Sequence, residues 1–259
     1  MEWPCVPCAG PGRMAVCCMK SRECVCMERR TGGMISSMPC VPGICSMCFS
    51  ACGQYLAQLS SEADCIHVHS VVSGELLYAA PAGVFPRCMK LDRRGKLLLC
   101  AGGAVGEAYL LQMPDLMRVN TIYTHHPCFA ADFWQNGLVL VCAAEGEDIR
   151  TVVYTLPNRQ TQPRQVIELP GPPGALCVCE DGLSALVSTR AGLSRLNLKT
   201  GALLWNCPEW ALCMRAECRN GEALISDTLD GSVWLFSQLK PWQRRRIVRA
   251  ADSQACFLE

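Results

Sequence analysis

The chain has 259 residues, a formal net charge of +1, 50% hydrophobic residues and 18% charged residues. This composition is sufficient for a buried core and argues against intrinsic disorder. A charge so close to zero offers no field to attract nucleic acid or an acidic membrane, and no uncharged apolar stretch is long enough to span a bilayer. We therefore expect a folded protein with neither of these partners.

Short apolar segments followed by a glycine recur six times along the chain. The glycines are Gly12, Gly53, Gly95, Gly137, Gly182 and Gly221, at intervals of 41, 42, 42, 45 and 39 residues. A period near forty that contains short strand-like runs is typical of a β-propeller, in which each repeat forms one four-stranded blade. We predict an all-β β-propeller with six four-stranded blades, and seven blades as the alternative.

Turn residues divide each repeat further. A second turn signal follows each glycine by 19 to 21 residues, and a third lies about midway. Turn backbones favour Gly, Asn, Asp and Pro, so three turns per repeat separate four strands. The first two repeats align at a constant offset of 41, which places Glu23 on Asp64, Cys24 on Cys65, Val25 on Ile66 and Gly33 on Gly74.

The repeats predict a single domain with blades near residues 1–40, 41–82, 83–124, 125–169, 170–207 and 208–259. Residues 65–69 and 193–198 alternate like half-buried strands, whereas 97–100 and 138–142 are continuously apolar and suit inner strands. Residues 3–8 should be an inner strand, and residues 253–259 should pair near the first blade and close the ring. We expect almost no helix, and burial of Leu97, Leu99, Val139, Val141, Leu186, Leu224 and Trp234.

Residues 49–53, 60–64, 66–68 and 73–77, which read FSACG, SSEAD, IHV and SGELL, resemble a WD40 or YncE-like propeller repeat. Residues 230–235 are similar to the third strand of such a repeat, and residues 196–205, LNLKTGALLW, resemble the tryptophan motif of quinoprotein-type propellers. The Gly-His and Trp-Asp dipeptides of WD40 blades are absent, so their hydrogen-bonded tetrad is not expected. The resemblance implies a fold and no particular activity, because propellers host many unrelated functions.

Cysteine is unusually frequent, with 21 residues, twelve of them in the first 88 positions. The number is odd, and a propeller core of this size does not need disulfides. The start of the chain also lacks the basic and apolar regions of a secretion signal. We interpret the cysteines as small apolar residues in a reducing, cytoplasmic compartment.

Two CxxC pairs, Cys5/Cys8 and Cys45/Cys48, are the candidate metal ligands. Two thiolates separated by two residues can chelate a tetrahedral zinc ion. The gap of 36 residues between the pairs, however, follows the blade repeat, and residues three apart in a strand point to opposite faces. We therefore expect repeated strand residues here, and no bound metal or cofactor.

Histidines and acids give weak signals for catalysis. His67 and His69 share one face of a predicted strand and could bind a metal, although solvent-facing side chains are the simpler interpretation. Asp92, Asp132, Asp181 and Glu217 lie shortly before the repeat glycines, so they could cluster at one rim or could serve the turns themselves. No nucleophile elbow, P-loop or dinucleotide-binding glycine pattern occurs in a suitable setting.

Two classes of function remain open. The first is a non-catalytic scaffold that binds a protein or peptide through its rim or channel mouth, using loops such as 87–94 and 125–132. The second is a small-molecule site in the central channel, of a metal-dependent hydrolase, lactonase-like or quinone type. For the first class the candidate binding residues are Arg87, Lys90, Asp92, Arg93, Arg94, His125 and His126. The basic run 244–246 with Arg249 is expected to be a solvated outer strand.

Overall fold

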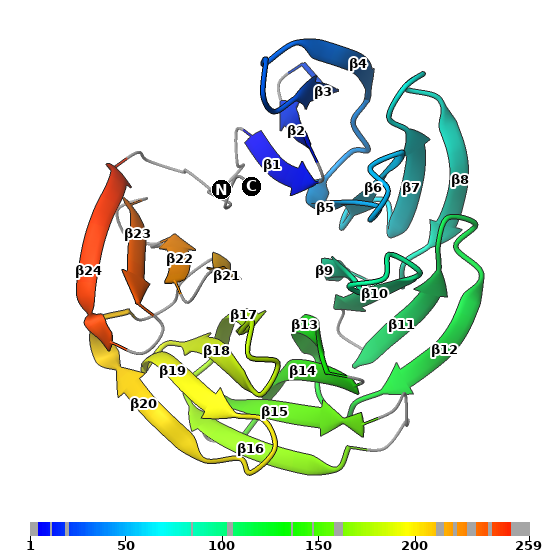
Figure 1. Cartoon of the computed structure of the whole chain (residues 1–259). Coiled ribbons are helices and arrows are strands. Elements are labelled where there is room, and N and C mark those ends of the chain that lie inside the picture. The colour runs from blue at the N-terminus through cyan, green and yellow to red at the C-terminus, as the bar shows by residue number, and fades with distance from the viewer. Residues whose placement is uncertain are drawn as a thin grey trace. The chain divides into compact units, whose positions relative to one another are not determined.

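The structure, a computed structural model, describes residues 5–10, 12–18, 21–83, 85–102, 106–135, 137–146, 148–157, 163–210, 215–219, 222–226, 232–237 and 240–249. These residues form six four-stranded antiparallel sheets, each a meander of four consecutive strands (Figure 1). The chain therefore has the predicted all-β, β-propeller fold. The expected blade boundaries and the single domain stay predictions, because the contacts divide the chain into two compact units, one up to Tyr123 and one from Thr124.

The first unit contains three sheets, whose first strands contact one another from sheet to sheet. Their strands are β1 (Cys5–Gly10), β2 (Arg13–Cys18), β3 (Glu23–Glu28), β4 (Met34–Pro39), β5 (Ile44–Phe49), β6 (Tyr55–Ser60), β7 (Cys65–Ser70), β8 (Leu76–Pro81), β9 (Pro86–Leu91), β10 (Leu97–Gly102), β11 (Glu107–Gln112) and β12 (Arg118–Tyr123).

The second unit contains the other three sheets, and again the first strands of neighbouring sheets contact one another. Its strands are β13 (Cys128–Trp134), β14 (Gly137–Ala144), β15 (Arg150–Leu156), β16 (Gln165–Pro170), β17 (Pro173–Val178), β18 (Ser184–Thr189), β19 (Gly192–Asn197), β20 (Leu203–Cys207), β21 (Arg215–Arg219), β22 (Glu222–Ser226), β23 (Ser232–Ser237) and β24 (Lys240–Arg249). A short 3-10 turn, η2 (Pro208–Trp210), follows β20.

The predicted offset of 41 between the first two repeats is wrong by one residue within the strands. β2 and β6 begin at Arg13 and Tyr55, a difference of 42, because Gln54 is inserted between Gly53 and its strand. A one-residue slip exchanges the two faces of a strand. Cys24 therefore matches Ile66, and both side chains are fully buried, whereas Cys65 is only half-buried.

At three positions the repeat glycine adopts a backbone conformation that favours glycine over other residues. Gly53, Gly95 and Gly182 have φ of +67°, +66° and +62°, and each N–H donates to the carbonyl oxygen three residues earlier at 2.8 to 2.9 Å. Glycine adopts this left-handed conformation without steric cost. In the fourth sheet Gln135 takes a positive φ instead of Gly137. The glycines that recur in the sequence thus mark a repeated turn between the first and second strands of a sheet.

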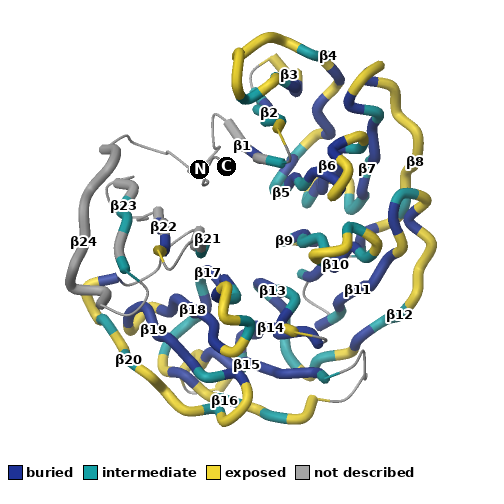
Figure 2. Tube along the Cα trace, in the orientation of Figure 1, coloured by how far each residue is buried: buried dark blue, intermediate teal, exposed yellow. Residues whose placement is uncertain are grey.

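The buried core lies on the second and third strands, while fourth strands such as β8 and β16 are largely exposed (Figure 2). Leu99, Val139, Val141 and Leu186 are buried as predicted, each with no exposed surface. Leu97 and Trp234 are half-buried, which is less than predicted. Leu97 opens β10 beside a turn, and Trp234 packs edge-on against Trp210 with the ring centroids 5.3 Å apart.

Several expectations fall on parts of the chain that the structure does not describe. Residues 3 and 4, the segment 253–259 and the side chain of Leu224 lie outside the described residues. The basic segment does form a last strand, β24, paired with β23. No helix in the described part of the chain is long and apolar enough to cross a membrane.

Candidate functional site

The basic candidates do not gather in one loop. Arg87 and Lys90 lie on β9, whereas Arg93 and Arg94 lie in the turn that follows it. At about 3.3 Å per strand residue, Arg87 lies roughly 13 Å from Leu91, the last residue of β9 before that turn. The expectation that residues 87–94 form one loop is therefore wrong, because Pro86–Leu91 is a first strand of its sheet.

The acids placed before the repeat glycines are occupied in structural hydrogen bonds. Asp92 Oδ1 accepts the N–H groups of Lys96 at 2.7 Å and Leu97 at 2.9 Å, which closes the turn. Asp132 Oδ2 accepts the N–H of Val178 at 3.1 Å and so joins β13 to β17. These carboxylates hold backbone groups of turns and strands. The side chain of Glu217 is outside the described residues.

The two loop histidines lie in the connection between β12 and β13. His125 is exposed and His126 is half-buried. The backbone oxygen of His126 accepts the Thr124 hydroxyl at 2.7 Å. The segment expected to be a loop ends there, because Cys128–Trp134 is strand β13.

The CxxC pair on β5 has an unexpected arrangement. A β-bulge at Cys45 shifts the register with β6, so Cys45 and Cys48 pack against the same apolar cluster and do not face opposite sides of the sheet. Burial raises the pKa of Cys45 to about 11 and raises that of Cys48 as well. Both side chains are therefore protonated, and Cys45 contacts the carbonyl oxygens of Leu59 and Pro86 at 3.6 and 3.5 Å. In the other pair, Cys8 is buried and the side chain of Cys5 is not described.

His69 is not solvent-facing, which corrects the simpler interpretation of the histidine pair. Its side chain is 3% exposed, and burial lowers its pKa. Its Nδ1 lies 3.2 Å from the carbonyl oxygen of Gly74, while Nε2 has no hydrogen-bond partner. Among the residues that the structure describes, no group of three or more His, Cys, Asp or Glu side chains is arranged to hold a metal ion.

An exposed aromatic side chain marks the link between β8 and β9. Phe85 is 60% exposed and its backbone has φ of +54°, a conformation that is costly for a bulky residue. Asp64, in the turn between β6 and β7, holds it there: Oδ1 accepts the Phe85 N–H at 2.8 Å, and the Asp64 carbonyl accepts the Ala82 N–H at 2.8 Å. No sequence pattern indicated this residue, because Phe85 belongs to neither a motif nor a repeat position.

The strand before Phe85 presents an apolar edge. β8 is the last strand of its sheet, and its sequence LLYAAP contains no charged or amide side chain. Leu76, Leu77 and Tyr78 are 51%, 42% and 39% exposed. Edge strands of natural proteins usually carry charges or are covered, because their free backbone groups pair with other strands. β8 has no charged side chain on this edge, although it contains a β-bulge at Leu77 and ends in Pro81.

An ionic network that joins the buried Arg195 to the exposed Asp181 lies in the second unit. Arg195 on β19 donates through Nη2 to Asp181 Oδ2 at 2.9 Å, and through Nε to the Ser184 hydroxyl at 3.0 Å. Cys179 lies beside it, 3.9 Å from the sulfur of Cys218. The thiol of Cys218 lowers the pKa of Cys179, with further help from Ser184 and Arg195 against the effect of burial. This arrangement favours a thiolate, yet Cys179 is only 1% exposed.

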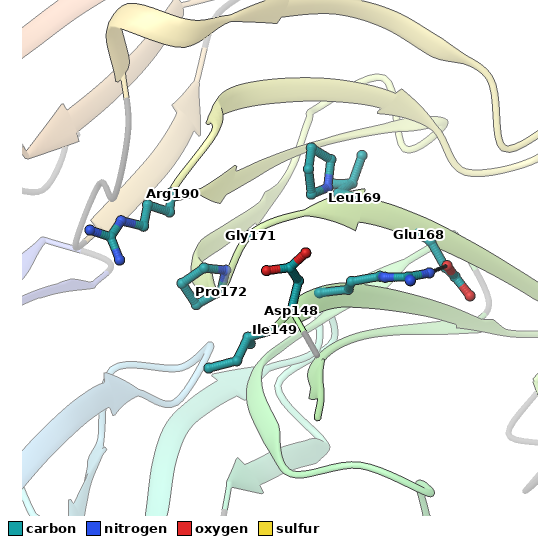
Figure 3. A pocket seen from close by; sticks show the side chains of 9 residues that line it. Asp148, Ile149, Glu168, Leu169, Gly171, Pro172 and Arg190 are labelled. Carbon is teal, nitrogen blue, oxygen red and sulfur yellow. Dashed lines mark hydrogen bonds and ion pairs between the residues drawn. The ribbon is translucent and has the colours of Figure 1, made fainter. Parts of the chain in front are cut away.

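An open depression of about 730 Å³ lies on the second unit, where β15 begins and β16 ends (Figure 3). Asp148 and Glu168 contribute negative charge, and Arg150 and Arg190 positive charge. Arg150 Nη1 and Glu168 Oε2 are 3.3 Å apart, and both side chains are mostly exposed. The balanced, solvated charges give this depression no preference for one class of ligand.

Comparison with known proteins shows the fold and nothing narrower. No family model matches the chain, and no curated protein matches it. Among solved structures the chain is similar to the dihydro-heme d1 dehydrogenase NirN in complex with DHE, with a TM-score of 0.69 and 16% identity over 93% of this chain and 55% of that one. The chain thus spans little more than half of that structure. At such low identity the likeness shows a β-propeller fold alone.

Proposed function

We propose that this protein is a non-catalytic β-propeller scaffold that binds an extended peptide segment of a partner protein along the edge of β8. The observation that carries the proposal is the apolar, uncharged and exposed sequence of this edge strand. An added strand would satisfy the free backbone groups of β8, and side chains of the peptide would contact Leu77 and Tyr78.

Phe85 supports the same interpretation from the adjoining link. An exposed phenylalanine held in a strained conformation by Asp64 is a pre-ordered apolar contact, and aromatic anchors of this kind often dominate binding energy. Its position on the link between two sheets agrees with a partner that docks at the rim. Arg87, two residues further on, is exposed and remains a candidate contact.

The alternative, a hydrolase or quinone-type site, has less support. The acids that could have clustered at one rim, Asp92, Asp132 and Asp181, each accept backbone N–H groups of turns or strands. A reducing, cytoplasmic location belongs to the same proposal. It is supported by the absence of disulfides among the cysteines whose side chains are described.

A phage-displayed library of random linear peptides, selected on the immobilised protein, tests the proposal. We expect enriched peptides with alternating apolar and β-branched residues, and Leu77→Lys should weaken their binding at least about tenfold, or about 1.4 kcal/mol. Val166→Lys is the matched control, because Val166 is 53% exposed on β16, the last strand of another sheet.

Three results would contradict the proposal. The selection could enrich no peptide, or the enriched peptides could bind the Leu77→Lys variant as well as the wild type. A concentration-dependent dimer of the wild type, lost in Leu77→Lys, would assign β8 to a second copy of the chain instead of a partner peptide. Sedimentation velocity of both proteins distinguishes that last case.

A further inference from the structure

The first and second sheets of the first unit meet through a core that is rich in sulfur. The residues of this core that carry sulfur are at most 9% exposed. They are Cys8, Cys17, Cys24, Cys26, Met38, Cys40 and Met47. Buried cysteine also serves as a small apolar residue, so a ligand site has to be argued from the positions of the sulfur atoms.

Three of these sulfur atoms converge. Cys17 on β2 and Cys24 on β3 are directly opposite each other in the antiparallel register, so their side chains share a face. Met47 on β5 reaches them from the second sheet: its Sδ lies 3.4 Å from Cys17 Sγ and 3.8 Å from Cys24 Sγ. The two cysteines are fully buried and Met47 is 6% exposed.

His69 gives an independent sign that this interface can take a ligand. It pairs with Leu56, and Leu56 belongs to the same buried cluster as the three sulfur residues. The contact of Nδ1 with the Gly74 carbonyl leaves Nε2 as an acceptor, and this buried atom has no hydrogen-bond partner. A buried polar atom without a partner is uncommon in proteins.

We propose that Cys17, Cys24 and Met47 form a binding site for Cu(I). Two thiolates and a thioether are soft ligands, which favour a soft ion such as Cu(I) over hard ions such as magnesium or calcium. A metal in the plane of three sulfur atoms, at about 2.3 Å from each, needs them roughly 4 Å apart. The separations to Met47 therefore have to open by only a fraction of an ångström.

Cu(I) binding at this site exchanges the metal for two thiol protons and needs no redox step. Cu(I) replaces two S–H bonds with two Cu–S bonds, releases two protons to solvent and forms a third bond to the neutral thioether of Met47. The metal keeps its oxidation state, and the reducing surroundings that the cysteine content indicates keep it as Cu(I). The donor set is two cysteines and a methionine; among the described residues no group of three or more His, Cys, Asp or Glu side chains is arranged to hold a metal ion.

Anaerobic titration of the reduced protein with Cu(I), in competition with a chromophoric Cu(I) chelator, tests the site. We expect one equivalent that survives the competition and is lost when Cys17→Ala and Cys24→Ala are combined. Met47→Leu keeps the volume of the side chain and removes only the sulfur, so it should weaken binding at least about tenfold while the fold is retained. X-ray absorption should show three sulfur atoms at about 2.3 Å from the metal.

Two matched variants separate this site from the other thiols. Met38→Leu replaces a methionine of the same buried cluster, and Cys100→Ala removes a fully buried thiol from the next one. Both should bind Cu(I) like the wild type. The proposal is wrong if Met38→Leu weakens binding as much as Met47→Leu, or if no equivalent survives the competition. Thermal unfolding of every variant shows which of them are folded, and Met47→Leu still decides the question if the cysteine variants unfold.

Discussion

β8 and β16 are both the fourth strand of a four-stranded meander, but their edges differ in charge. β8 reads LLYAAP and has no charged residue, whereas β16 reads QVIELP and its Glu168 pairs with Arg150 on the neighbouring strand. Both strands are exposed (Figure 2). The same position in the sheet is thus protected by charge in one unit and left apolar in the other.

This difference indicates which features serve folding and which serve another purpose. A charged edge prevents unwanted pairing with other chains, so its presence needs no further function. An apolar edge carries a cost in aggregation, and under the proposed function a partner peptide covers it. The side chains of β8 should therefore matter for binding and little for stability.

The largest effect should come from the core and not from the edge. Leu99→Ala on β10 should lower the free energy of unfolding by about 2–5 kcal/mol, because Leu99 has no exposed surface and its removal leaves a cavity. Leu77→Ala on β8 should cost less than about 0.5 kcal/mol, because that side chain is largely exposed. Urea unfolding of both variants measures the contrast. A decrease in the free energy of unfolding below about 1 kcal/mol for Leu99→Ala would contradict the assignment of Leu99 to the core. A decrease above about 1 kcal/mol for Leu77→Ala would show that Leu77 matters for stability.

Removing the charged side chain from β16, or adding one to β8, should change the self-association of the protein. Glu168→Val makes β16 resemble β8, so we expect several-fold faster aggregation at a fixed temperature, measured by light scattering. Leu77→Lys should slow aggregation relative to the wild type for the same reason. If Glu168→Val aggregates no faster than the wild type, the charge on β16 does not protect that edge.

The acid sensitivity of the second unit should depend partly on Asp181. Burial alone would raise its pKa, but hydrogen bonds from Ser184 and Leu183 and the charge of Arg195 hold it below the ordinary value. A depressed pKa contributes stability at neutral pH that is lost as the pH falls through the folded pKa. The side chain is 38% exposed, so solvent screening limits this contribution to on the order of 1 kcal/mol.

Asp181→Asn tests this contribution. The free energy of unfolding of the variant should fall less than that of the wild type between neutral pH and about pH 3. Denaturant titrations at several pH values measure the two slopes. Parallel curves for both proteins would show that Asp181 has the same pKa in the folded and unfolded chains.

The smallest effect should come from the ion pair at the edge of β16. Arg150 and Glu168 are 63% and 59% exposed, so a double-mutant cycle with alanine at both positions should give a coupling below about 0.5 kcal/mol. Such a value would show that the ion pair contributes little to the stability of the sheet. A coupling above about 1 kcal/mol would mean that the pair holds β15 and β16 together.

The sequence predicted the fold from properties that each strand carries locally. Turn glycines with positive φ and short apolar runs are visible in one chain, and they gave the sheets, the turns and the buried Leu99 and Val139. The offset between the first two repeats was wrong because the inserted Gln54 is as polar as its neighbours and leaves no trace in a glycine pattern.

The candidate sites were harder to predict because they depend on contacts between distant segments. Arg87 and Arg93 are close in sequence, but Arg87 lies near the start of strand β9 and Arg93 lies in the turn after it. The contacts between Cys17 and Met47, and between Phe85 and Asp64, cross from one part of the unit to another. His69 looked like a surface residue because the burial of a strand face depends on the sheet packed against it.

Hydrogen exchange of the β8 amides tests the central claim most directly. A peptide enriched by selection is added in excess, and exchange is followed by mass spectrometry in segments that cover residues 76–81 and, for comparison, 165–170 on β16. Strand addition predicts that exchange slows at least about tenfold in the β8 segment. Exchange in the β16 segment should not change. Unchanged exchange in β8, or equal slowing in both segments, would contradict the claim that β8 is the docking edge.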